Sequence, residues 1–122
     1  PTHQQTYPDL TSSTNAYSSY TYNEGILSRS QAANPDFYSW NHVEIKYCSS
    51  DLWSGNSVKN INASQSFNFK GRKILEAVFN QLNLEHNLVN ASSVIISGSS
   101  AGAVGVLNQG DWIKETYLSG KD

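Results

Sequence analysis

The chain has 122 residues, of which 38% are hydrophobic, and a formal net charge of -2 at pH 7. This size and balance indicate one globular unit, or part of one, and the absence of basic clusters predicts no nucleic acid partner. A single cysteine excludes an internal disulfide and cysteine-rich zinc sites, and no apolar run reaches the ~20 residues that a membrane span requires.

The N-terminal part of the chain shows two different patterns. Residues 1–23 are rich in Thr, Ser, Tyr and Asn without helical periodicity, which predicts an irregular segment before a domain over residues 24–122. Phe37, Tyr38 and Trp40 form a compact aromatic group that we expect at the edge of a core. Residues 43–47 then alternate between apolar and charged side chains, which predicts a β-strand.

A long polar connection follows over residues 48–66. It contains the turn signal Trp53-Ser54-Gly55-Asn56 but no periodicity of its own, and such connections usually carry function or are mobile. Asn62-Ala63-Ser64 and Asn90-Ala91-Ser92 have the N-x-S pattern of glycan acceptors in a secretory pathway. In a chain this rich in Asn and Ser, plain surface loops explain both tripeptides equally well.

The region from residue 69 to residue 88 is predicted to form an amphipathic helix. Apolar residues recur four apart and side by side, giving one continuous stripe: Ile74, Leu75, Val78, Phe79 and Leu82. Asn68 is the expected N-cap, and Asn87 or Asn90 could end the helix.

The last part of the chain contains the motif that points to chemistry. A short apolar strand over residues 93–97 leads into Gly98-Ser99-Ser100-Ala101-Gly102, which is followed by a helix to about residue 118. This is the GxSxG pattern of a nucleophile elbow, in which glycines avoid collisions where the chain turns and the central serine is exposed. Ser100 is therefore the candidate nucleophile, and the backbone N–H of Ala101 is the candidate oxyanion donor. An ordinary Ser/Gly-rich turn remains the alternative.

The order of the expected elements predicts an α/β fold with a parallel βαβα unit. Two parallel strands joined through a helix require a right-handed crossover, and loops at the carboxyl ends of neighbouring strands lie together. The connection over residues 48–66 and the elbow should therefore share one edge of the sheet.

Two segments resemble those of a known family. Residues 47–55, Tyr-Cys-Ser-Ser-Asp-Leu-Trp-Ser-Gly, are similar to the YCSSDxWSG signature of the pectin acetylesterase and Notum family. The resemblance continues through Phe-Lys-Gly-Arg-Lys-Ile at residues 69–74 and Ser-Gly-Ser-Ser-Ala-Gly at residues 97–102. It implies a partial α/β-hydrolase fold in which Ser100 attacks an ester carbonyl.

The resemblance also implies an Asp and a His from later in the chain, which would complete the catalytic triad with Ser100. No histidine follows Ser100, and the family's upstream glycine-rich GGGW segment is absent, so the chain is expected to be an internal fragment that is inactive alone. We interpret the remaining titratable candidates as surface, packing or helix-face residues: His3, His42, His86, Asp111 and Glu115.

Further residue roles follow from the resemblance. Cys48 matches a family cysteine that forms a disulfide with the upstream region, although within these residues alone a buried free thiol is the simpler interpretation. Asp51 would lie near the catalytic pocket, where it could contact substrate or organise its loop as an Asx turn. Trp53 is expected to serve in packing.

The leading hypothesis is a secreted carboxylic ester hydrolase that deacetylates a pectin-like polysaccharide or, alternatively, deacylates a protein. A non-catalytic binding module on the same fold is the second hypothesis, and a serine peptidase or general lipase is the third. No metal-ligand cluster or nucleotide loop occurs, so neither a metal nor a cofactor is expected.

Overall fold

The computed structural model describes residues 24–121, which form two compact units, residues 24–46 and residues 47–121. The irregular segment expected for residues 1–23 lies outside the described residues. Each unit is organised by its own set of contacts.

The first unit is held together by the buried side chain of Asn34. Its Nδ2 donates to the carbonyl oxygens of Ile26, at 2.9 Å, and Ser28, at 3.0 Å, and its Oδ1 accepts from the backbone N–H of Phe37 at 3.2 Å. The carboxamide thereby links the short 3-10 helix η3 (Gly25–Leu27) to the turns that follow it. The expected aromatic group is confirmed for Phe37 and Trp40, whose rings meet edge to face at 5.0 Å.

Residues 43–47 and 93–97, which we expected to be strands, are not paired as strands in the described part of the chain, so the parallel βαβα unit stays a prediction. An extended segment becomes a strand only when a neighbour takes its backbone hydrogen bonds. The described residues form one sheet, the antiparallel pair β1 (Ser57–Asn62) and β2 (Gln65–Phe69), and neither segment belongs to it.

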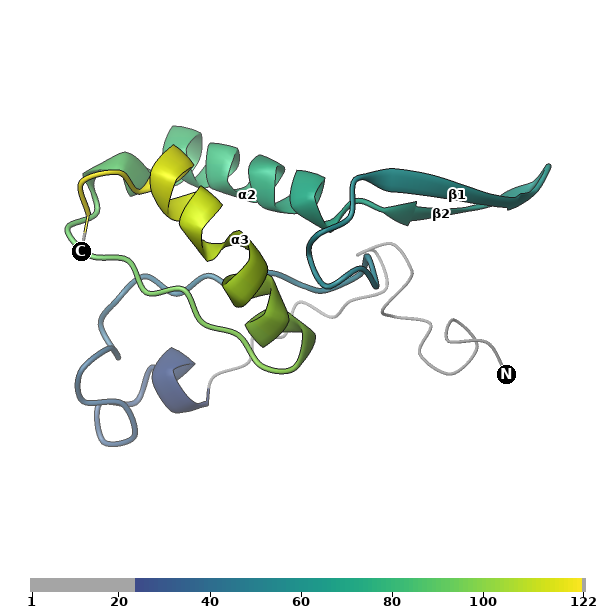
Figure 1. Ribbon diagram of the computed structural model, residues 1–122. Helices are drawn as coiled ribbons and strands as arrows, with labels where there is room; N and C mark the ends of the chain where they lie inside the picture. Colours follow the sequence, from purple (N-terminus) through teal and green to yellow (C-terminus); the bar gives the residue numbers. More distant parts are fainter. Residues whose placement is uncertain (1–23, 122) are drawn as a thin grey trace. The chain divides into compact units, whose positions relative to one another are not determined.

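Most of the hairpin of β1 and β2 lies in the connection over residues 48–66 for which we expected no periodicity, and β2 continues to Phe69, where we expected the helix to begin (Figure 1). Pairing runs from Ser57 opposite Phe69 to Asn62 opposite Gln65, with an irregularity at Ile61. All residues of β1 are exposed, so neither face is buried against a core. The sequence of β1, Ser-Val-Lys-Asn-Ile-Asn, lacks the alternation of apolar and polar residues that identifies a half-buried strand, so the pattern did not predict it.

Both predicted helices are confirmed, with shifted ends. Helix α2 spans Gly71–His86 and helix α3 spans Ala101–Tyr117. The N-cap of α2 is Lys70 rather than the expected Asn68, and its side chain makes no capping hydrogen bond. Of the two ends considered, Asn87 and Asn90, the helix ends at Asn87, which adopts the left-handed conformation, φ 57° and ψ 35°, that commonly ends a helix.

Figure 1 shows α3 crossing α2, and in each helix the buried residues lie four apart in sequence. In α2 the buried residues are Gly71, Leu75 and Phe79. The other members of the predicted apolar stripe, Ile74, Val78 and Leu82, are only partly buried. In α3 they are Gly105, Gln109 and Ile113. The rings of Phe79 and Tyr117 stack across the interface with centroids 5.2 Å apart.

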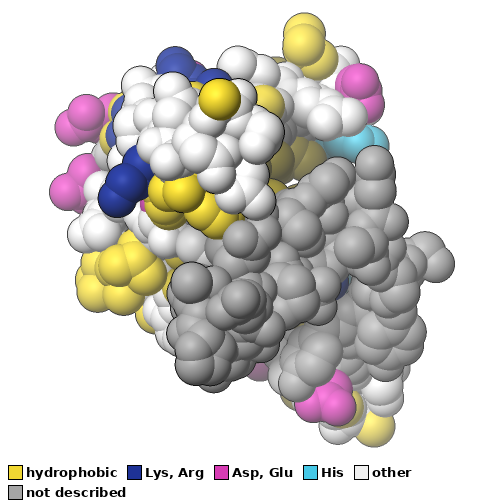
Figure 2. Space-filling model, turned by 90° about the vertical axis from the view of Figure 1, so that its right-hand side faces the viewer, with side chains coloured by type: hydrophobic (Ala, Val, Ile, Leu, Met, Phe, Trp, Pro, Cys, Tyr) yellow, Lys and Arg dark blue, Asp and Glu magenta, His cyan; other side chains and the backbone are white. Residues whose placement is uncertain are grey.

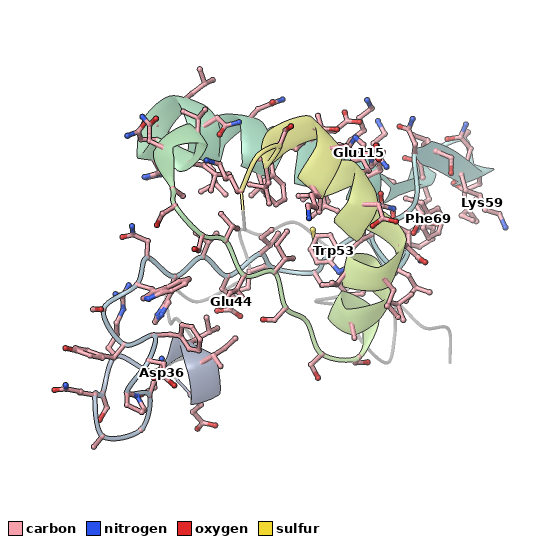
Figure 3. All side chains as sticks on the ribbon, turned by 60° about the vertical axis from the view of Figure 1, so that its left-hand side comes forward. Asp36, Glu44, Trp53, Lys59, Phe69 and Glu115 are labelled. Atoms are coloured by element: carbon pink, nitrogen blue, oxygen red, sulfur yellow. The ribbon has the colours of Figure 1, made fainter. Side chains whose placement is uncertain are left out.

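Trp53 fills the space beside α3 and is 6% exposed (Figure 3). A Cβ atom added at Gly105 would collide with the indole ring, so the helix must carry glycine at this contact. Glycine inside a helix costs about 1 kcal/mol relative to alanine. The close approach of tryptophan to the helix backbone explains why that cost is tolerated here.

We predict that Gly105→Ala destabilises the full-length protein by about 1–3 kcal/mol, because a rigid indole ring must move to admit the methyl group. The matched control is Gly110→Ala in the same helix, where the added Cβ meets nothing within 4 Å among the described residues. That change should be neutral or stabilising. Denaturant unfolding of both variants gives the comparison, and equal destabilisation would contradict the proposed contact.

Candidate active site

Ser100 has an unusual backbone conformation at the start of α3. Its φ is 53° and its ψ is -120°, whereas residues that precede a helix normally have extended angles. A non-glycine residue with such angles carries strain of about 1–3 kcal/mol, and strain of this kind clusters at functional sites. The side chain is exposed and makes no capping hydrogen bond with its helix, so its helix does not engage the hydroxyl.

The turn at Ser100 is tight on one side. A Cβ atom at Gly98 would collide with the backbone carbonyl of Gly102, and the N–H of Gly102 donates to the carbonyl oxygen of Ser99 at 2.8 Å. Gly98 is therefore required by the close approach of the backbone. An added Cβ at Gly102 meets nothing within 4 Å in the described part of the chain, so sterics there do not require glycine at that position.

The backbone N–H of Ala101 lies in the first turn of α3. N–H groups in the first turn have no partner within the helix, and the positive end of the helix dipole favours negative charge. These groups can therefore stabilise an oxyanion that develops near Ser100.

The second motif forms a loop that is organised around the carboxylate of Asp51. Its Oδ1 accepts from Ser49 Oγ at 2.6 Å and from the N–H of Trp53 at 3.0 Å, while Oδ2 accepts from the N–H of Gly71 at 2.6 Å. Gly71 is the first residue of α2, so this carboxylate takes the place of the missing local cap. The bond from the N–H of Trp53 to Oδ1 closes an Asx turn, which is one of the two roles considered for Asp51.

The loop is strained as well as hydrogen-bonded. Ser50, Leu52 and Trp53 all have φ between 50° and 62°, a region that non-glycine residues seldom adopt. Asp51 lies between them in sequence and accepts a hydrogen bond from one of them, Trp53. The loop geometry therefore depends on interactions that offset the local backbone preferences.

Polar contacts join this loop to both helices. Arg72 donates to Gln109 Oε1 at 2.6 Å, and Gln109 and Asn108 donate to Ser54 Oγ at 3.4 and 3.3 Å. The guanidinium of Arg72 also stacks over the ring of Trp112, 3.3 Å from its centroid. The sequence analysis assigned no individual role to Arg72 or Gln109, although the FKGRKI match at residues 69–74 includes Arg72.

The thiol and the phenol that precede the loop resist ionisation. Burial raises the pKa of Cys48 above its usual value, and the negative charge of Asp51 adds to the effect. Burial also raises the pKa of Tyr47, whose hydroxyl oxygen accepts a hydrogen bond from the N–H of Leu52 at 2.8 Å. Cys48 is a free, partly buried cysteine in the structure. A free thiol in such a place packs as a small hydrophobic side chain.

Four of the other titratable candidates lie in the described part of the chain. His42 Nε2 is 2.8 Å from the carbonyl oxygen of Phe37 within the first unit, and His86 is exposed in the last turn of α2. Asp111 and Glu115 are exposed on α3, as the helix-face interpretation predicts, and Figure 3 shows Glu115 on this helix. His3 lies outside the described residues. Among residues 24–121 no cluster of three metal-ligating side chains occurs, and no helix could span a membrane.

A family model described as Pectinacetylesterase matches residues 2–121, which is nearly the whole chain. The chain belongs to the pectinacetylesterase family. Its curated relatives include proteins named for two ester substrates, pectin acetyl groups and palmitoleoyl groups on protein.

The chain is 40% identical over 111 residues to the palmitoleoyl-protein carboxylesterase NOTUM of Schmidtea mediterranea, covering 91% of this chain and 20% of the relative. It is 41% identical over 91 residues to NOTUM of Homo sapiens, with 75% and 18% coverage. It is 37% identical over 83 residues to pectin acetylesterase 7 of Arabidopsis thaliana, with 68% and 21% coverage. The chain thus spans about a fifth of the length of these relatives.

We predict that Asp51→Ala destabilises the full-length protein by about 1–3 kcal/mol, because the N–H of Gly71 loses its acceptor in a buried position. Asp51→Asn should cost less, since a carboxamide keeps one acceptor oxygen for the Asx turn. Asp111→Ala, which removes an exposed carboxylate from α3, is the matched control and should change stability by less than about 0.5 kcal/mol. Similar unfolding midpoints for Asp51→Ala and Asp111→Ala would disprove the role given to Asp51.

Proposed function

We propose that the protein containing this chain is a serine carboxylic ester hydrolase with Ser100 as its nucleophile. The observation that carries the proposal is the strained backbone of Ser100 at the sharp turn into α3. Family membership supports the reaction class, because the relatives are named as acetylesterases and carboxylesterases.

The chemistry follows from the geometry of the turn. Ser100 Oγ attacks the ester carbonyl, and the N–H of Ala101 at the start of α3 stabilises the oxyanion of the tetrahedral intermediate. A serine hydroxyl is a weak nucleophile until a base takes its proton. We propose that a histidine and an acid from a part of the protein outside this chain supply that base and orient it, in the order Ser, Asp, His.

The same proposal includes the fold of the whole domain. In an α/β-hydrolase the elbow follows a strand of a parallel sheet, and residues 93–97 come directly before the elbow motif at residues 98–102. We propose that residues 43–47 and 93–97 become strands of a βαβα unit when strands from elsewhere in the protein pair with them. Cys48 would then pair with a cysteine from the upstream region.

The substrate class is an acetylated pectin-like polysaccharide or an acylated protein, the two kinds of substrate that the relatives' names contain. We propose a secreted enzyme, as the resemblance to the family implies. Secretion also fits an oxidised Cys48, because disulfides persist outside the cytosol.

Replacement of the nucleophile tests the proposal. We predict that the full-length protein hydrolyses a short-chain aryl ester and that Ser100→Ala lowers kcat by at least about 10⁴-fold, as expected when the attacking oxygen is removed. Ser99→Ala is the matched control, because it removes the neighbouring exposed hydroxyl and should retain activity.

Two results would contradict this assignment. Equal rates for wild-type protein and Ser100→Ala would exclude Ser100 as the nucleophile. A wild-type protein that binds the polysaccharide or acylated peptide without hydrolysing any ester would instead support the non-catalytic binding module.

A further inference from the structure

The tripeptide Asn62-Ala63-Ser64 lies at the tip of the β1–β2 hairpin, far along the chain from Ser100. Asn62 is the last residue of β1, Ala63 and Ser64 form the turn that leads to β2, and all three residues are exposed. Figure 1 shows this hairpin extending away from α2 and α3. Figure 2 views the molecule from the side toward which the hairpin points, where hydrophobic side chains stand at the surface among polar ones.

The side chain of Asn62 is arranged as an Asx turn. Its Oδ1 accepts from the backbone N–H of Ser64 and from Ser64 Oγ, both at 3.0 Å. The hydroxyl thus donates to the carboxamide within one tripeptide, and Nδ2 donates to Gln65 Oε1 at 3.1 Å in an exposed hydrogen bond. Since an Asx turn needs only neighbouring residues, it can form before the rest of the chain folds.

The second tripeptide, Asn90-Ala91-Ser92, is held differently. Nδ2 of Asn90 donates to Asn87 Oδ1 at 2.7 Å, and Lys121 Nζ donates to the carbonyl oxygen of Ala91 at 2.8 Å. Asn90 also ends the 3-10 helix η4 (Leu88–Asn90) that directly follows α2. The Asn90 tripeptide is thus tied to Lys121, 30 residues further along the chain, whereas the partners of the Asn62 carboxamide, Ser64 and Gln65, lie within three residues of it.

We propose that Asn62 carries an N-linked glycan. In the transfer, Asn62 Nδ2 bonds to C1 of an oligosaccharide whose C1–O bond to a lipid pyrophosphate breaks. The pyrophosphate leaves with the electron pair, and the carboxamide gives up one proton to a base of the transferase. This proposal rests on the proposed function only through secretion, because the transfer occurs in the secretory pathway.

The glycan has a physical consequence for the hairpin. Both edges of the two-stranded sheet are free of further strands in residues 24–121, and Val58 and Ile61 are about half exposed. Free edges with apolar side chains are sites of strand pairing between molecules. A bulky hydrophilic group at the tip opposes that pairing.

The test uses the full-length protein behind a cleavable secretion signal in cultured animal cells, with a reference N-x-S tripeptide in an appended tag. Cell and medium fractions are combined, treated with peptide N-glycosidase in ¹⁸O water, and analysed by peptide mass spectrometry. We expect Asn62 to be converted to ¹⁸O-labelled Asp in most molecules, and to a greater extent than Asn90. Asn62→Gln and Ser64→Ala should each remove one glycan, while Ser64→Thr and Asn90→Gln should retain the glycan at Asn62.

Unmodified Asn62 in molecules whose reference tripeptide is glycosylated would overturn the proposal, because those molecules met the transferase. Ser100→Ala separates this outcome from a failure of the esterase assignment. That variant should carry the same glycan at Asn62, whatever its activity toward esters.

Discussion

The hydrogen bonds of the Asp51 carboxylate are the constraint on which the rest of the second unit depends. One oxygen shapes the loop through Ser49 and Trp53, and the other accepts from the first N–H of α2. The carboxylate is closely surrounded, since a Cβ atom at Gly55 or Gly71 would collide with its oxygens. Hydrogen bonds to a charged group contribute about 1.5–3 kcal/mol each, which is enough to offset the strained angles beside it.

The loop acts on the candidate nucleophile through Trp53. With Asp51 holding the backbone of Trp53, the indole ring lies against Gly105, which is five residues from Ser100 in α3. Five residues correspond to about 7.5 Å along a helix axis. The two motifs thus meet through packing. The motif at residues 98–102 contains the strained serine, and the motif at residues 47–55 supplies the tryptophan that packs against the helix after that serine.

The sequence predicted those features that depend on local periodicity or local caps. The apolar spacing predicted α2, Asn87 its end, and the GxSxG pattern the turn before α3. Prediction from the sequence failed for features of the structure that depend on a contact with a residue distant in sequence. Residues 43–47 and 93–97 alternate or are apolar as strands are, yet a strand exists only when paired. The Asp51–Gly71 bond spans 20 residues, and Trp53 meets Gly105 across 52 positions, so no spacing rule could indicate either contact.

The buried Gln109 shows why polar contacts accompany this packing. Its side chain is 5% exposed on the same face of α3 as Gly105 and Ile113, where an unsatisfied carboxamide would cost about 1–3 kcal/mol. Arg72 and Ser54 satisfy it from α2 and from the loop, so α3 reaches low energy only when both are in place. An apolar residue at 109 would tolerate small shifts of the helix, whereas these directional bonds do not. The strain at Ser100 therefore persists because α3 is fixed along its length by Trp53 packing and by hydrogen bonds, rather than by any cap at the serine itself.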